Sequence, residues 1–389
     1  MHAYLDCAAT TPVRPEVLEA MHVPLTECFA NPSGAHALAR RARALLDEAR
    51  ETIAGLLGVT PGEIIFTSGG TESDNLAITG AVHEHGGRPV CSNIEHHAVL
   101  EPVSAAGGVL VPVDRRGLVE PDVLARVLDG VGDVAVVSVM AVNNEIGVAQ
   151  PIRELVEVTR RHAPGALFHV DAVQAWSWLD VTPLCEVVDL LSLSGHKFGA
   201  PKGTGILFVR KGVKIRPLLV GGGQERGLRS GTQNVAGAVA MAAAARAAVK
   251  ERGSLVERVG AMRRWLAREL TDRVPGVHET LAWAGCADVD RVDGILHLCI
   301  EGVEGEELLY LLERHEVYAS VASSCSSGAS RPSHVLDALG VPDELARGAL
   351  RLSFGWCTSE AEVRHAAEVI PGVVEELRSR RRYVEAVLR

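Results

Sequence analysis

The chain has 389 residues, of which 47% are hydrophobic and 23% are charged, as in ordinary soluble globular proteins. Its net charge of −10 argues against a surface built to bind nucleic acid or an acidic membrane. No basic segment followed by an apolar one opens the sequence, and the longest uncharged apolar stretch, 235–245, is far shorter than the ~20 residues of a membrane span.

Eight cysteines are scattered along the chain without a C-x-x-C pair. This spacing indicates neither a disulfide framework nor a zinc site. We therefore expect a cytoplasmic protein with reduced thiols. The basic run at 378–382 is interpreted as the solvated end of a helix.

Helical spacing of apolar residues predicts a first helix over 34–57, which Gly58 ends. Short runs rich in β-branched residues then alternate with helical patterns. The strands predicted from these runs are 63–67, 90–92, 109–112, 134–142, 167–170, 187–193 and 205–210. Several of them are apolar throughout, as is typical of strands covered by helices on both faces. The alternation predicts an α/β fold with a mainly parallel central sheet.

A long Ala-rich helix at about 234–273 leads out of this region. Beyond it the sequence predicts a strand over 294–300, a helix over 305–315 and a final helix that begins at Ser359, with Glu362 at capping-box spacing. We expect two domains. The large α/β domain covers 12–255, and a small α+β domain combines 1–11 with 256–389.

The first candidate site is the glycine-rich turn 68–74, which follows a predicted strand and opens a helix. Free backbone N–H groups and the helix dipole favour a phosphate at such a place. The alternative is a tight turn in which Thr71 caps the helix through Asp74.

The second and third candidate sites also follow predicted strands. Asp171 lies at the carboxyl end of the strand over 167–170, where open α/β sheets bind ligands, although it could instead cap a following helix. Lys197 follows the next strand in the run Ser-Gly-His-Lys, where an amine can be desolvated and form a Schiff base. Lys202 is a nearby competitor for this role.

Pyridoxal phosphate needs a phosphate cradle, an acid for its pyridine nitrogen and a Schiff-base lysine. The chain offers all three at successive strand ends within one domain. The sequence therefore predicts this cofactor.

A fourth feature is the small, polar, aperiodic segment 319–332, which contains Cys325. We expect a mobile loop with an exposed thiol, followed by a short helix that Pro332 and Ser333 cap. The thiol could be incidental. In an enzyme with a reactive lysine and a phosphate site, however, it suggests transfer of a group from the cofactor site to a partner.

At this point the residues resemble a known family, the cysteine desulfurases of the class V aminotransferase group, which have the fold-type I architecture. The resemblance spans nearly the whole chain, and its motifs are the segments 4–6, 8–12, 31–33, 66–73, 95–99, 142–147, 169–174, 194–198, 221–226, 229–232 and 324–328. The long serine-rich segment around Cys325 resembles the group whose loop hands a persulfide to partner proteins.

The resemblance implies roles for the matching positions. Lys197 would form the Schiff base with pyridoxal phosphate, Asp171 would pair with the pyridinium nitrogen, and His96 would stack on the ring and move protons. Asn144 and Gln174 would contact the phenolic oxygen of the ring. The residues implied to hold the phosphate are Gly70, Thr71, Ser194, Gly195 and His196, with Thr232 reaching it from the other subunit of a homodimer.

The implied activity converts L-cysteine to L-alanine and holds the sulfur as a persulfide on Cys325. No metal site is predicted, although Cys325 could be a transient iron–sulfur ligand. The implied partners are L-cysteine, a second copy of the chain, and a sulfur-acceptor protein such as an iron–sulfur scaffold or a thiolation enzyme. The alternatives are another class V activity, such as selenocysteine lyase or transaminase, and a degenerate sulfur-relay or scaffold protein.

The chain departs from the family pattern at two positions. Trp356 stands where the family commonly has an arginine that grips the substrate carboxylate. We expect Arg331 or Arg351 to supply that contact instead. Cys7 stands in place of the usual asparagine, which we interpret as a packing substitution.

Overall fold

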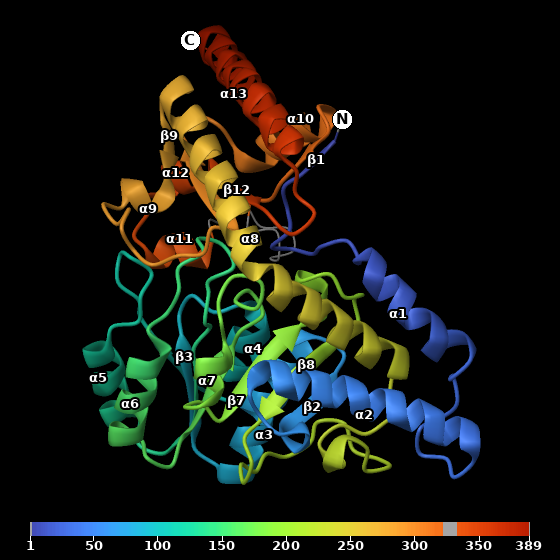
Figure 1. Ribbon diagram of the computed structural model, residues 1–389. Helices are drawn as coiled ribbons and strands as arrows, with labels where there is room; N and C mark the ends of the chain where they lie inside the picture. Colours follow the sequence, from blue (N-terminus) through green and yellow to red (C-terminus); the bar gives the residue numbers. More distant parts are fainter. Residues whose placement is uncertain (1, 322–332, 389) are drawn as a thin grey trace.

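A computed structural model describes residues 2–321 and 333–388 (Figure 1). Cys325 and Arg331 lie outside the described residues. No helix of the described residues is long and apolar enough to cross a bilayer.

The central sheet of the described chain has seven strands in the order β2-β8-β7-β6-β5-β3-β4. Their bounds are β2 Ile64–Thr67, β3 Arg88–Ser92, β4 Val109–Val111, β5 Val134–Ser138, β6 Leu167–Asp171, β7 Leu190–Ser194 and β8 Gly205–Val209. The strands from β7 to β4 pair in parallel, whereas β8 is antiparallel to both β7 and β2. The prediction of an α/β fold with a mainly parallel sheet is thus confirmed.

Helices cover both faces of this sheet. Neighbouring residues of a strand point to opposite faces, so Ile64 and Ile65 of β2 pack against different helices. Ile64 packs in a buried cluster with helices α2 (Ala37–Leu57), α5 (Pro121–Val131), α6 (Ile152–His162) and α8 (Val235–Arg273). Ile65 packs on the other face with α3 (Gly70–His85) and α4 (His97–Ala105). Gly58 ends α2 with a φ of 70°, a left-handed conformation that glycine adopts without strain.

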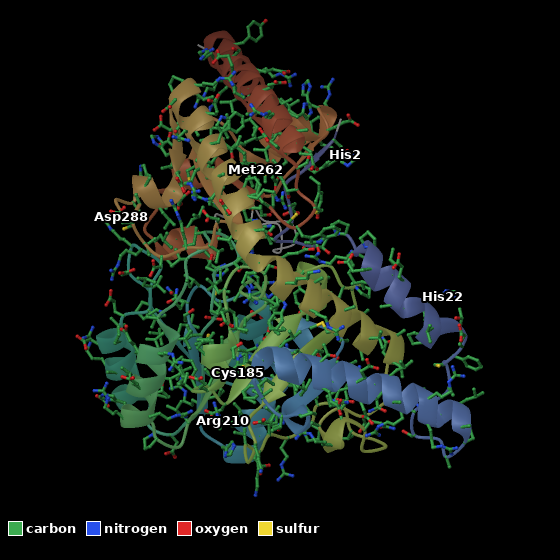
Figure 2. All side chains as sticks on the ribbon, in the orientation of Figure 1. His2, His22, Cys185, Arg210, Met262 and Asp288 are labelled. Atoms are coloured by element: carbon green, nitrogen blue, oxygen red, sulfur yellow. The ribbon has the colours of Figure 1, made fainter. Side chains whose placement is uncertain are left out.

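Helix α8, 39 residues long, runs from the sheet region into a second group of elements (Figure 1). There an antiparallel sheet has the order β12-β10-β9, with bounds Ala349–Ser353, Ile295–Ile300 and Val277–Glu279. Helices α10 (Gly305–Arg314) and α13 (Glu360–Leu388) share its buried core with the second half of α8. Figure 2 shows Met262 of α8 in this upper part, and Cys185 and Arg210 in the lower part.

The start of the chain crosses to the second part, because β1 (Ala3–Tyr4) pairs in parallel with β11 (Val317–Tyr318). The remaining helices are α1 Pro15–Thr26, α7 Thr182–Cys185, α9 Thr280–Trp283, α11 His334–Ala338 and α12 Asp343–Ala346. Ser359 and Glu362 cap α13 reciprocally, as predicted. The assignment of two domains with a boundary at residue 255 stays a prediction.

Two of the seven predicted strands differ from the structure by three or more residues at one end, and the other five differ by at most two. The strand over 134–142 ends at Ser138, and the strand over 187–193 lies instead at 190–194. In the first case Val139, Ala141 and Val142 are apolar because they are buried. The backbone N–H groups of Val139 and Ala141 still donate to β6, but the regular strand has ended. In the second case Val187 and Val188 belong to the turn that follows α7.

Candidate active site

The candidate residues gather at the carboxyl ends of β6 and β7. Asp171 is the last residue of β6, and Ser194 is the last residue of β7. Gly195, His196 and Lys197 form a single 3-10 turn directly after Ser194. Because β6 and β7 are parallel neighbours, both ends lie on one edge of the sheet, where open α/β sheets bind ligands.

The Lys197 amine is held by the start of the chain. Its Nζ donates to the carbonyl oxygens of Ala8 at 2.6 Å and of Ala9 at 2.9 Å. Gln174 Nε2 donates to the same Ala8 oxygen at 2.8 Å. The competitor Lys202 is exposed. The fold therefore places Lys197, and not Lys202, among the other candidate residues.

Asp171 is buried beside this lysine. Its Oδ1 accepts from the backbone N–H of Val173 at 2.9 Å. Residues 173–178 form turns and not a helix, so the alternative of a helix cap is wrong. Burial raises the pKa of Asp171 to about 6, while the Val173 N–H and the Lys197 charge act in the opposite direction. A carboxylate here is available to a cationic ring nitrogen.

His96 caps the N-terminus of α4 close enough to Lys197 to feel its charge. Its Nδ1 accepts from the backbone N–H of Ala98 at 3.1 Å. Burial, and to a lesser extent the charges of Lys197, His97 and His334, lower the pKa of His96 to about 4. His96 is therefore neutral at pH 7, and the hydrogen bond at Nδ1 leaves its proton on Nε2.

The predicted phosphate cradle is a tight backbone turn. Gly69 is the N-cap of α3, and Gly70 is its first residue. A methyl group added at Gly70 would lie 2.9 Å from Val173 Cγ2 and 3.4 Å from Ser194 Cβ. The alternative cap by Thr71 through Asp74 is wrong, because no side chain caps this helix end. Its free N–H groups remain available to an anion.

His196 joins this cradle to the start of the chain. Its Nδ1 lies 3.1 Å from Thr10 Oγ1, and its carbonyl accepts from the backbone N–H of Thr11 at 2.9 Å. Burial, and to a lesser extent the charges of Lys197 and Lys202, lower the pKa of His196 to about 4. A neutral His196 can donate one hydrogen bond without adding a charge.

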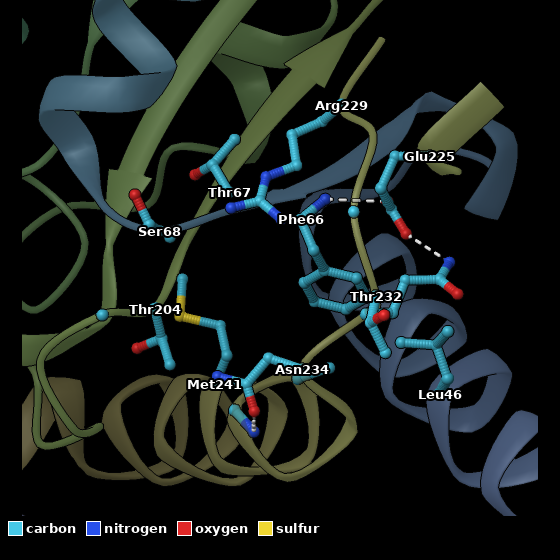
Figure 3. Close-up of a pocket in the computed structure, with 16 residues that line it drawn as sticks. Leu46, Phe66, Thr67, Ser68, Thr204, Glu225, Arg229, Thr232, Asn234 and Met241 are labelled. Carbon is cyan, nitrogen blue, oxygen red and sulfur yellow. Dashed lines mark hydrogen bonds between the residues drawn. The ribbon is translucent and has the colours of Figure 1, made fainter. Parts of the chain in front are cut away.

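Thr232 is exposed and lines a pocket of about 200 Å³ that opens beside Ser68 and Thr204 (Figure 3). Glu225 anchors one wall of this pocket, accepting from the backbone N–H of Phe66 at 2.9 Å and from Gln233 Nε2 at 2.8 Å. None of Lys197, Asp171 and His96 lines this pocket.

Three buried groups behind Asp171, namely His169, Asp74 and Glu95, were missed by the sequence analysis. His169 bridges Ser138 Oγ at 2.8 Å and Ser192 Oγ at 2.9 Å, and Asp74 Oδ1 lies 3.6 Å from its Nε2. Burial raises the pKa of Asp74 well above its usual value, and Asp171 raises it further. The signal in the sequence is that each of these three side chains lies in a segment with other candidate residues, namely 68–74, 95–99 and 169–174.

Glu95 lies in the same buried region. Its Oε1 accepts from Ser92 Oγ and from the backbone N–H of Met140, whereas its buried Oε2 has no partner among the described residues. Burial raises the pKa of Glu95 to about 8, against the lowering by these two hydrogen bonds.

The structure describes only one of the two arginines that were predicted to bind the substrate carboxylate. Arg331 lies outside the described residues, and Arg351 is a buried residue of β12. Arg351 Nη2 donates to Asp6 Oδ1 at 2.9 Å and Nη1 donates to the carbonyl of Asn144 at 3.0 Å, while its buried Nε has no partner among the described residues. The structure thus brings Asn144 and Arg351 together.

Trp356 is not part of this contact. Arg14 Cζ lies 4.7 Å from the centre of its ring, and Arg258 Nη2 donates to its carbonyl at 3.1 Å. Over residues 2–321 and 333–383, no group of three or more His, Cys, Asp or Glu side chains is placed to hold a metal ion.

Comparison with known proteins identifies the family. The profile of the class V aminotransferases matches residues 3–365. Cysteine desulfurase IscS of Dictyoglomus turgidum is 42% identical over 384 residues, which is 97% of this chain and 95% of the relative. A solved NifS-like protein is 36% identical and superposes with a TM-score of 0.87 over 96% of this chain and all of that chain. The structure of SspA in complex with cysteine is 32% identical, with a TM-score of 0.76 over 90% of this chain and 98% of that chain.

Proposed function

Because the chain belongs to the class V aminotransferases and is a cysteine desulfurase, we propose that Lys197, Asp171 and His96 carry its chemistry on L-cysteine. Its activity converts L-cysteine to L-alanine and passes on the sulfur. The observation that carries the proposal is that Lys197 Nζ donates hydrogen bonds to two backbone carbonyls, close to the buried Asp171 at the carboxyl end of a parallel strand.

The residues present fit pyridoxal phosphate, the cofactor that this family uses. A cradle at Gly70 that a single methyl group would fill suits a phosphate, with Thr71, Ser194, Gly195 and His196 around it. Asp171 would hold the ring nitrogen, and Asn144 and Gln174 would contact the phenolic oxygen. When bound, the cofactor supplies an electron sink for the carbon that bears the substrate amine.

Lys197, His96 and Asp171 would each have a separate role in moving or holding a proton. Lys197, once its amine is free, would take the proton from Cα of the substrate, and the carbonyls of Ala8 and Ala9 orient that amine. Neutral His96 would lie against the ring and offer its Nε2 proton. Asp171 would keep its charge above pH 6, which favours a protonated ring nitrogen.

We further propose that Cys325 receives the sulfur as a persulfide. The sequence around it, small and serine-rich over 319–332, supports this role, and so does the full-length similarity to cysteine desulfurases. The thiolate of Cys325, a far better nucleophile than the thiol, would attack the substrate sulfur. The new S–S bond forms as the bond between Cβ and sulfur breaks, and the electron pair of the broken bond stays with carbon, which takes up a proton on the way to alanine. A transient iron–sulfur contact of Cys325 stays a prediction.

A matched pair of lysine variants tests the assignment of Lys197. We expect Lys197→Ala to abolish both the yellow colour of the cofactor-loaded protein and the release of alanine from L-cysteine. Lys202→Ala should keep both, because Lys202 is exposed. Normal alanine release by Lys197→Ala would contradict the proposal.

The persulfide step has its own test. Cys325→Ala should lose sulfide release in the presence of a reductant while keeping the yellow colour. Sulfide release at the wild-type rate by this variant would refute a persulfide on Cys325.

We also propose a homodimer in which Thr232 reaches the phosphate of the partner subunit. Exposed apolar side chains next to this segment support it, since Leu219 is 47% and Val220 is 80% exposed. Sedimentation should give twice the mass of the chain, and Val220→Asp should shift the protein toward monomer. The proposed recipient of the sulfur is a cytoplasmic iron–sulfur scaffold or thiolation enzyme.

A further inference from the structure

Two thiols face each other beside the candidate active site. Cys7 follows β1, and Cys357 lies between β12 and α13, with their Sγ atoms 3.8 Å apart. Cys7 is 4% exposed, and Cys357 is half-buried. Both segments lie along the end of β12, where the backbone N–H of Cys7 donates to Ser353 O and that of Ala8 donates to Ser353 Oγ. The pairing is therefore built into the fold.

The turn around Cys357 is shaped to receive the Cys7 sulfur. Gly355 N–H donates to Thr358 Oγ1 at 2.9 Å, and Thr358 N–H donates to the Gly355 carbonyl at 3.2 Å, which closes the turn. A methyl group added at Gly355 would lie 2.9 Å from Cys7 Sγ. Glycine at this position thus leaves the space that the sulfur fills.

The two thiols are chemically unequal. The hydrogen bond between the two thiols lowers the pKa of Cys357, and Arg14 lowers it further, while burial and Glu362 oppose them. The same hydrogen bond raises the pKa of Cys7 well above its usual value, and burial adds to the rise. Cys357 is therefore the better nucleophile of the pair, and Cys7 the donor that stabilises its thiolate.

We propose that Cys7 and Cys357 form a second reactive-thiol site, in addition to Cys325, that a low-molecular-weight disulfide converts to an intramolecular disulfide. This inference does not depend on the function proposed for Cys325.

The exchange proceeds in two balanced steps. The Cys357 thiolate attacks one sulfur of the small disulfide, forms a mixed disulfide, and releases one small thiolate. Cys7 then loses its proton and attacks Cys357 Sγ, and the second small thiolate leaves. Two protein thiols are oxidised, and the small disulfide is reduced to two thiols.

A disulfide between Cys7 and Cys357 would affect Lys197 through the backbone that follows Cys7. An S–S bond is ~2.05 Å long, so the two sulfurs must approach by about 1.8 Å. The residues next to Cys7 are Ala8 and Ala9, whose carbonyls hold Lys197 Nζ. We expect closure of the disulfide to move these carbonyls and change the hydrogen bonds of Lys197.

Mass spectrometry of the cofactor-loaded protein tests the proposal. A Cys325→Ser background removes the other expected reactive thiol, and oxidised glutathione is the probe. We expect a loss of two hydrogen masses, a peptide that links Cys7 to Cys357, and reversal by dithiothreitol. In the same background, Cys7→Ser should stop at a glutathione adduct on Cys357. Cys286→Ser is the control, since Cys286 is the other described cysteine that is partly exposed, and it should leave the cross-link unchanged.

The absorbance of the bound cofactor gives a second readout. It should shift on oxidation of the Cys325→Ser protein, and it should not shift when Cys357 is also replaced by serine. A stable glutathione adduct on Cys357 with Cys7 still free would overturn the proposal. Absence of any reaction at Cys357 would overturn it as well.

Discussion

Arg351 and Asp6 form a partly buried ion pair in which Nη2 lies 2.9 Å from Oδ1. These residues are 345 positions apart in the chain, and they meet where the end of β12 passes the start of the protein. The pair lies beside Asn144, whose carbonyl accepts from the same guanidinium. Asp6 therefore occupies one of the donors that a substrate carboxylate would need.

The first prediction concerns this competition. If Arg351 binds the substrate carboxylate, Asp6→Asn should lower the Michaelis constant for L-cysteine, because the guanidinium loses its ionic partner. Arg351→Ala should raise that constant about tenfold or more, the cost of one charged hydrogen-bonded contact. Steady-state kinetics of both variants gives the answer.

Arg331→Ala separates the two candidate cations. A raised constant in this variant, with an unchanged one in Arg351→Ala, would assign the carboxylate contact to Arg331. Unchanged constants in both arginine variants would rule out the hypothesis that either cation replaces the arginine lost at position 356.

The second prediction concerns the charge on Asp171. We expect Asp171→Asn to lower kcat on the order of 100-fold, because a neutral amide no longer favours a protonated ring nitrogen. In the wild type, cofactor affinity should fall as the pH drops below about 6, where Asp171 takes up a proton. Absorbance titration with pyridoxal phosphate at several pH values measures the affinity.

Asp189→Asn is the matched control for this variant. Asp189 is also buried beside the sheet, but it lies at the amino end of β7, where it accepts from Phe168 N–H and Arg160. Its replacement should lower thermal stability and leave kcat nearly unchanged. Equal loss of kcat in both variants would mean that Asp171 acts only through the fold.

The sequence predicted that Asp171, Lys197 and the turn at Gly70 lie together, and the structure places Gly70 beside Val173 and Ser194 and Lys197 near Asp171. Each follows a short apolar strand, and the carboxyl ends of parallel strands meet on one edge of the sheet. The strand prediction was weaker at Val139 to Val142, which are apolar because they are buried but lie outside β5.

The hydrogen bonds from Lys197 to the start of the chain could not be predicted in the same way. The carbonyls of Ala8 and Ala9 act through the backbone, so their side chains carry no signal. Their position depends on β1, a strand of two residues that pairs with β11 more than 300 residues later. The contact of Arg351 with Asp6 depends on the same long-range pairing.

The third prediction uses the raised pKa of Glu95, about 8 in the folded protein. The folded state binds this proton more tightly than the unfolded chain does. Its contribution is therefore fully present below the ordinary pKa of a glutamate, and it is lost as the pH rises through about 8. The wild type loses this contribution as the pH rises, and Glu95→Gln does not. From pH 5 to pH 8 the free energy of unfolding of the variant, relative to that of the wild type, should therefore rise by at least about 1 kcal/mol.

Denaturant unfolding of the cofactor-free protein at several pH values measures this gain. Glutamine keeps an oxygen for the Ser92 and Met140 donors, so the variant tests the proton and not the contacts. A difference between variant and wild type that does not change with pH would show that Glu95 is ionised in the fold.

The last prediction concerns the close approach of β8 to the phosphate turn. A methyl group at Gly205 would lie 2.6 Å from Gly69 Cα, a backbone atom that no side-chain rotation can move away. Gly205→Ala should therefore cost about 1–3 kcal/mol of stability and weaken cofactor binding, because the strand must push the turn aside. Gly165→Ala is the control, since no atom lies within 4 Å of its added methyl group. Thermal unfolding with and without pyridoxal phosphate separates the two effects, and an unchanged cofactor-induced shift in Gly205→Ala would mean that the turn does not hold the phosphate.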